Sequence, residues 1–189
     1  DMSLIKEYVI PADSEGFNFS FREIKVDPIR PYVYALKYKF KHADKFYHYA
    51  KIEIYNYETM QLEGELTSEK DEELFLQNLA ISKDGKYLAI MTELESYIKV
   101  WDLETREEIR TFKLCNDYPN GPSGYPTCLK FSEKDTDNIY FSGSFPQSNS
   151  TFVSHRGLFK YNIQENKIID STFGVVPNQV HYGYFSFFN

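Results

Sequence analysis

The chain has 189 residues, a net charge of −7 and 17% aromatic residues, with 16 Tyr and 16 Phe but only 1 Trp. This length suits one domain or part of one, and the acidic balance argues against a generic binder of nucleic acid or anionic membranes, which needs clustered positive charge. No apolar run approaches the roughly 18 residues that span a bilayer, and Cys115 and Cys128 are too few for a disulfide framework. We therefore expect an intracellular, cytoplasmic protein that binds neither nucleic acid nor membranes.

The first of three similar units covers residues 17–66 and follows an extended segment at residues 4–10. Alternating apolar and polar residues predict strands near 20–26, 32–40 and 50–57. Asp27 and Pro28 supply the first turn. The last of these strands ends on Tyr55 and Asn56, and this aromatic–Asx pair returns in each later unit.

The second unit, residues 75–114, has the clearest pattern, with strands predicted at 76–82, 87–92, 97–103 and 108–114. Asp84 and Gly85 form its hairpin turn, because glycine tolerates the positive φ that such a turn requires. Its aromatic–Asx pair is Trp101 and Asp102. We expect Trp101 to lie between two sheets, in contact with five apolar residues, namely Ile81, Leu88, Ile90, Ile98 and Val100.

The third unit, residues 126–173, predicts strands at 127–132, 138–144, 158–163 and 167–173, and its aromatic–Asx pair is Tyr161 and Asn162. A further extended segment follows at 179–188. The spacing from Tyr55 to Trp101 is about 46 residues and that from Trp101 to Tyr161 is about 60, which fits one period near 40–45 residues plus an insertion in the third unit.

The middle unit, LAISKDGKYLAI followed by IKVWDLETREEIRTF, resembles a WD repeat of the β-propeller family. The resemblance implies an all-β fold of antiparallel four-stranded blades. About three blades are present, whereas a ring takes roughly four to eight. We therefore expect a fragment of a larger ring, completed by further blades of a parent chain or by an oligomer. The Gly-His dipeptide of the family is missing from every unit, so packing should depend on aromatic and aliphatic side chains.

Residues that could support catalysis are scattered. The histidines at 42, 48, 155 and 181 lack paired-ligand spacing, and the chain has neither a GxSxG motif nor a glycine-rich phosphate loop. Glu93 and Glu95 fit a solvated loop better than an acid–base pair. We expect no catalytic residue, no metal and no cofactor.

Loops on a rigid sheet scaffold are better candidates for recognition. In the family that the middle unit resembles, such loops gather on one face of the propeller. On this chain that face would contain residues 41–49, 93–97, 116–125 and 146–156. Tyrosine and arginine are enriched at binding hot spots, and the candidate partner-binding residues are Tyr47, Tyr118, Tyr125, His155 and Arg156. Trp101, Asp102, Asp84 and Gly85 are expected to have structural roles.

Three functions compete at this stage. The first is a non-catalytic scaffold that binds a protein partner through the loops on one face. The second is an architectural subunit of a large assembly, such as a ciliary or ribonucleoprotein particle. The third is a propeller enzyme of the lactonase or hydrolase type. The resemblance to WD repeats favours the scaffold, and the protein is expected not to be an enzyme.

Overall fold

The computed structural model describes residues 18–40, 47–66, 76–92, 97–113, 125–146 and 154–175. These residues form twelve β-strands and no helix, which confirms the all-β fold. The extended segments expected at 4–10 and 179–188 lie outside the described residues.

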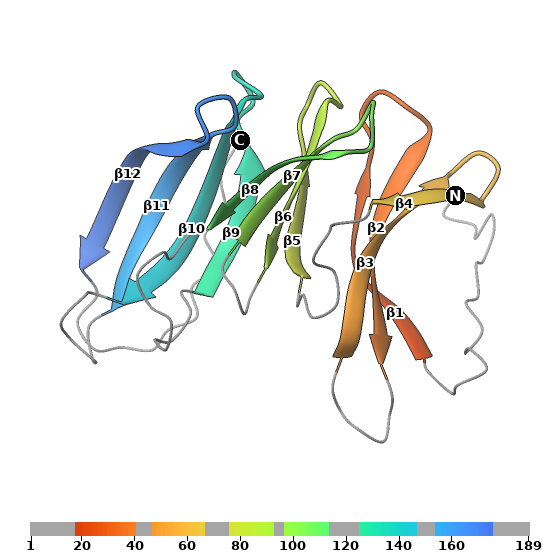
Figure 1. The fold of residues 1–189 in the computed structure, drawn as a ribbon, viewed down its shortest axis with the longest axis horizontal. Coiled ribbons are helices and arrows are strands. Elements are labelled where there is room, and N and C mark those ends of the chain that lie inside the picture. The colour runs from red at the N-terminus through yellow and green to blue at the C-terminus, as the bar shows by residue number, and fades with distance from the viewer. Residues whose placement is uncertain are drawn as a thin grey trace, which may run out of the picture.

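The strands form three separate four-stranded antiparallel sheets, each with its strands in chain order (Figure 1). The first sheet contains β1 (Asn18–Val26), β2 (Tyr32–Phe40), β3 (Tyr47–Asn56) and β4 (Gln61–Leu66). The second contains β5 (Leu76–Ile81), β6 (Tyr87–Thr92), β7 (Tyr97–Asp102) and β8 (Glu108–Lys113). The third contains β9 (Tyr125–Phe131), β10 (Asn138–Pro146), β11 (Ser154–Asn162) and β12 (Lys167–Val175).

Two features differ from the sequence prediction. The strand β4 was not predicted, because its sequence QLEGEL mixes charged residues with Gly64, and both lower β propensity. In the third sheet, β10 continues to Pro146 and β11 begins at Ser154, so residues that were assigned to an insertion lengthen a hairpin instead.

The repeated aromatic–Asx pair has a local structural cause at the end of each third strand. The Oδ1 atom of Asp102 accepts hydrogen bonds from the backbone N–H groups of Glu104 and Thr105, at 2.9 and 3.1 Å. Asn56 makes the same two bonds with the residues that follow it, and Asn162 accepts one from Glu165. The Asx side chain therefore closes the turn that leads to the fourth strand.

The first and second sheets pack face to face through one apolar cluster. Trp101 is 2% exposed and lies in this cluster, as predicted, with Leu88 and Ile90 buried beside it and Ile81 partly buried against it. The first sheet contributes apolar residues from β2, β3 and β4, namely Tyr34, Leu36, Tyr38, Ile52, Ile54 and Leu66.

The expected contacts of Trp101 with Ile98 and Val100 are wrong. These two residues alternate with Trp101 along β7, so their side chains lie on the opposite face of the sheet. There they belong to a second cluster, which joins the second sheet to the third.

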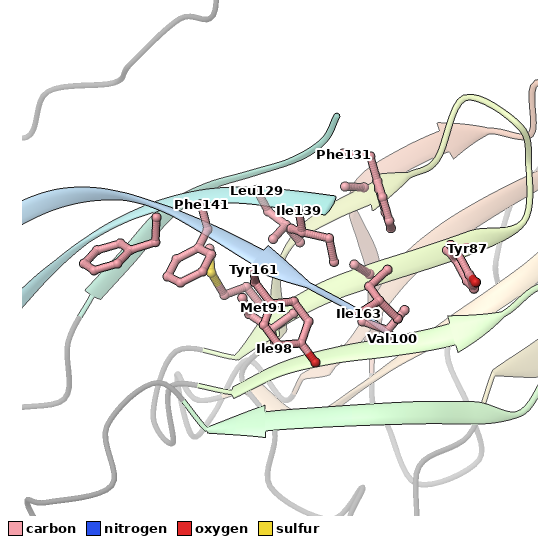
Figure 2. Packing of buried hydrophobic residues seen from close by; sticks show 13 residues of the cluster. Tyr87, Met91, Ile98, Val100, Leu129, Phe131, Ile139, Phe141, Tyr161 and Ile163 are labelled. Atoms are coloured by element: carbon pink, nitrogen blue, oxygen red, sulfur yellow. The ribbon is translucent and has the colours of Figure 1, made fainter. Parts of the chain in front are cut away.

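The third sheet contributes four aromatic rings to that second cluster, those of Phe131, Phe141, Phe159 and Tyr161 (Figure 2). Tyr87 of the second sheet stacks on Phe131 of the third, with ring centroids 6.5 Å apart. Phe112 and Tyr161 form a closer pair across the same junction, at 4.7 Å. The second sheet is thus covered on both faces, and all six residues of β6 are buried.

Candidate interaction surface

The two ends of the sheets differ in the length of their connections. Six short turns lie at one end, at residues 27–31, 57–60, 82–86, 103–107, 132–137 and 163–166, and we call this end the turn face. In Figure 1 these turns lie along the upper ends of the three sheets. At the opposite end, which we call the loop face, the chain connects strands through residues 41–46, 67–75, 93–96, 114–124 and 147–153.

Arg30 ties the turn face of the first sheet to that of the second. Its Nη1 atom donates to the carbonyl oxygen of Leu103 at 2.9 Å, and its Nη2 atom donates to that of Gly85 at 2.5 Å. The Asp27 carboxylate holds the guanidinium in place, with its Oδ2 atom 2.7 Å from Nη2. This bridge fixes the orientation of the two turns.

Burial opposes ionisation of Asp27, but hydrogen bonds from Arg30 and from the backbone N–H of Ile29 outweigh it. The pKa of Asp27 is therefore below its usual range. The Tyr34 hydroxyl also donates to this carboxylate, at 3.1 Å. Asp27 thus stays ionised as the anchor of the junction between the first two sheets.

Asp84 has the corresponding role between the second and third sheets. Its Oδ1 atom accepts from the Ser82 hydroxyl and from the backbone N–H of Lys86, and its Oδ2 atom accepts from Thr136 of the third sheet at 2.8 Å. Burial opposes ionisation, but these hydrogen bonds lower the pKa of Asp84. Gln164 adds a second link by donating to the Tyr87 hydroxyl.

Gly85 lies at the junction of the first two sheets with φ of +68°. A Cβ atom at this position would come within 2.9 Å of Cγ1 of Ile29. The turn therefore requires glycine both for its backbone conformation and for the close approach of the neighbouring turn.

The sequence-predicted partner-binding residues are distributed around the loop face. Tyr47 begins β3 and Tyr125 begins β9, while His155 and Arg156 are the second and third residues of β11. Tyr118 lies outside the described residues. The strand ends thus place four of the five candidates at the loop end of the sheets.

Two of these candidates share a cross-strand row of the third sheet. Ser144 of β10 is paired with Tyr125 on one side and with Arg156 on the other. His155 is in the next row, opposite Phe145. The register therefore brings a tyrosine, a histidine and an arginine to one corner of the third sheet.

The inner strands β1, β5 and β9 form a third distinct region. The Oε2 atom of Glu23 accepts from the backbone N–H of Leu79, at 2.6 Å, and Glu23 is also paired with Lys25, at 2.9 Å. Burial raises the pKa of the Cys128 thiol, and this effect outweighs the nearby positive charges of Lys130 and Lys25, which lower the pKa. The thiol is therefore protonated at neutral pH, and a protonated thiol is a poor nucleophile.

Within the described ranges, no three His, Cys, Asp or Glu side chains are grouped so that they could hold a metal ion. The same part of the chain has no helix long and apolar enough to cross a membrane. His42, His48, His181, Glu93, Glu95 and Cys115 lie outside it.

No protein-family model and no curated protein matches the sequence. The structure is similar to that of an acylaminoacyl peptidase from Pyrococcus horikoshii, with a TM-score of 0.61 and 13% identity over 84% of this chain and 25% of that one. It is also similar to the β-propeller domain of the Trilobed protease from Pyrococcus furiosus, which has an open velcro topology, with a TM-score of 0.52 and 18% identity over 85% of this chain and 44% of that one. The WD40 domain of Toxoplasma gondii coronin matches with a TM-score of 0.57 and 11% identity, over 83% of this chain and 35% of that one.

The three sheets are blades of a β-propeller. The chain spans less than half the length of each of these similar chains. At these identities the similarity shows the fold alone, so membership of the WD-repeat family stays a prediction. From here we call the sheets the first, second and third blades.

The residues that tie the blades together were not identified from the sequence. Arg30 is 55 residues from Gly85 and 73 residues from Leu103, and Glu23 is 56 residues from Leu79. No local pattern marks such pairs. Asp84 was recognised only as a turn residue, and its bond to Thr136 depends on the packing of the blades.

Proposed function

We propose that the chain is a non-catalytic scaffold that binds a protein partner through its loop face. The observation that carries the proposal is the asymmetry between the two ends of the blades. On the turn face, short connections bond to one another through Arg30, Asp84 and Gln164. On the loop face, three of the five connections, at 67–75, 114–124 and 147–153, are longer than any of the turns, and long connections at the ends of a rigid stack are the usual arrangement of a recognition surface on a sheet scaffold.

The chemistry of the loop face fits a protein partner. Tyr125 and Arg156 flank Ser144 in the third blade, and Tyr47 begins the third strand of the first blade. Tyrosine and arginine combine a large contact area with hydrogen-bonding groups, which makes them frequent anchors of protein interfaces. The connection that contains Tyr118 enters the third blade just before Tyr125.

The test begins with affinity purification of the full chain to identify its partner, followed by calorimetric titration with that partner in recombinant form. The double variant Tyr118→Ala and Arg156→Ala should weaken binding by more than about 1 kcal/mol, or about five-fold. If these loops serve recognition and not packing, its melting temperature should stay close to that of the parent, because surface substitutions change stability little.

The matched control places the same number of truncations on the turn face. Lys83→Ala with Glu104→Ala removes two exposed side chains there and should leave the affinity unchanged. The proposal is wrong if the turn-face variant loses affinity and the loop-face variant keeps it.

A second candidate is the propeller segment of a hydrolase, because the similar structures include an acylaminoacyl peptidase and a protease propeller. The measurement that separates it from the scaffold is release of p-nitroaniline from an N-acylaminoacyl p-nitroanilide by the full chain, alone and with its purified partner. Release by the chain alone would identify an enzyme. Release only with the partner would make the chain an accessory to a partner enzyme.

A further inference from the structure

Equivalent positions in the three blades can be matched by shared backbone hydrogen bonds. The N–H groups of Tyr57, Leu103 and Ile163 each donate to the residue that precedes the second strand of their own blade. The N–H groups of Asp27, Ser82 and Ser132 each donate to the first residue of that second strand. These bonds align the blades residue by residue and define two faces. The rear face of a blade points toward the preceding blade, and the forward face points toward the following one.

The rear face of the first blade is apolar and exposed at its turn-face end. Ile24, Val26 and Tyr57 are 53, 62 and 47% exposed. The residues at the same positions of the second and third blades face a preceding blade and are buried or partly buried: Leu79 and Leu129, Ile81 and Phe131, and Leu103 and Ile163. The first blade therefore has the apolar side chains of a blade junction, and no blade among the described residues covers them.

The charges on this rear face compensate one another. Glu53 is buried there and pairs with Lys37 at 2.9 Å and with Lys51 at 3.1 Å. Lys51 also pairs with Glu65, at 2.7 Å, and the Tyr55 hydroxyl donates to Glu53. Because two lysines balance two glutamates, this cluster can be covered by another sheet without leaving an unpaired charge.

The junctions already present show what fits such a face, which is the forward face of another blade. The forward faces of the first and second blades are covered by the blades that follow them. Among the described residues, the forward face of the third blade is uncovered: Leu158 is 39% exposed, whereas the matching Ile52 and Ile98 are fully buried. Lys160 and Tyr140 lie beside it, with the ammonium 5.9 Å from the ring centroid.

We infer that the rear face of the first blade packs against the forward face of the third blade of a second copy of this chain. The contact continues the blade-on-blade stacking within the chain. In the reciprocal contact, each copy offers the forward face of its third blade to the rear face of the other copy's first blade, which closes the pair. Closure also forms two identical junctions for a single loss of rigid-body freedom.

The test is the molar mass of the full chain, measured by light scattering and sedimentation velocity from micromolar to hundred-micromolar concentrations. A single species of twice 22.3 kDa is expected. Val26→Glu and Leu158→Glu each place an unpaired charge in both junctions and should raise the dimer dissociation constant by about ten-fold or more. A mixture of the two variants restores one junction of the two and should dimerise better than either variant alone.

The matched control is Ile29→Glu, which makes the same kind of change at a residue that is 69% exposed on the turn face. It should leave the dimer intact, and far-UV circular dichroism should show that all three variants keep their sheets. A chain that stays monomeric at every concentration would overturn the inference. A dimer that survives both interface variants, or a ladder of open oligomers, would also overturn it.

Discussion

Asp27 is a buried carboxylate whose ionised form holds the turn-face junction of the first two blades. Its side chain is fully buried, and its partners are a guanidinium, a tyrosine hydroxyl and backbone N–H groups. Loss of this charge would weaken the ion pair that positions Arg30, which donates hydrogen bonds to the carbonyl groups of Gly85 and Leu103.

Asp27→Asn keeps the size of the side chain and removes its charge. At neutral pH the variant should be less stable than the parent by about 2 kcal/mol, the usual contribution of hydrogen bonds to a charged group. Because the pKa of Asp27 is lowered in the folded chain from its ordinary 3.8, its stabilising effect is present above that value and is lost as the pH falls through the folded pKa. Urea unfolding followed by Trp101 fluorescence at a series of pH values measures both effects.

The parent should therefore lose stability below about pH 4, and the variant should lose less over the same range. Glu53 and Asp84 also have lowered pKa values. The variant should therefore still lose some stability as the pH falls. Parallel pH profiles for the two proteins would show that Asp27 does not have this role.

At the scale of the strands, the sequence predicted what depends on neighbours along the chain. Alternating residues and turn chemistry located eleven of the twelve strands in the described part of the chain. The missed strand β4 is exposed along most of its length, and its partner β3 is what makes it a strand. Alternation along β7 already puts Ile98 and Val100 on the face opposite Trp101, but the neighbouring sheet that each face meets depends on the packing of the blades.

In the candidate site, too, the sequence predicted what depends on neighbours along the chain but not what depends on strand pairing. Strand alternation and turns place Tyr47, Tyr125 and Arg156 near the ends of strands, and those ends are found at the loop face. The pairing of Tyr125 and Arg156 with Ser144 required the register of three strands. The pairing of β9 with β10 shifts between Ser142 and Gly143, so the partner of Ser144 cannot be found by counting alternate residues alone.

Hydrogen exchange should separate the strands by burial. Amides of β6 are expected to exchange most slowly, because the strand is paired on both edges and buried on both faces. Amides of β4 should exchange fastest among the strands of the first blade, since it is an outer strand that is paired on one edge and exposed. Exchange followed by mass spectrometry of peptides measures this order, and faster exchange in β6 than in β4 would contradict it.

At the scale of the whole molecule, the apolar clusters join the blades in sequence order within the described residues. One apolar cluster joins the first blade to the second, and another joins the second to the third. In such a stack, stability is approximately a sum of blade terms and nearest-neighbour junction terms. In the monomer, below the concentration at which two copies associate, weakening one junction should therefore release the terminal blade on that side before the rest unfolds.

Two matched substitutions test this arrangement. Ile54 and Ile139 are both buried isoleucines, in the first and second junction respectively, and truncation of either to alanine should cost about 2–5 kcal/mol. Trp101 is the single tryptophan and lies in the first junction. In Ile54→Ala its fluorescence should change at a lower urea concentration than the circular dichroism of the sheets, whereas in Ile139→Ala the circular dichroism should begin to fall first. If both signals change together in both variants, the three blades unfold as one cooperative unit, and their junctions are strong compared with the blades themselves.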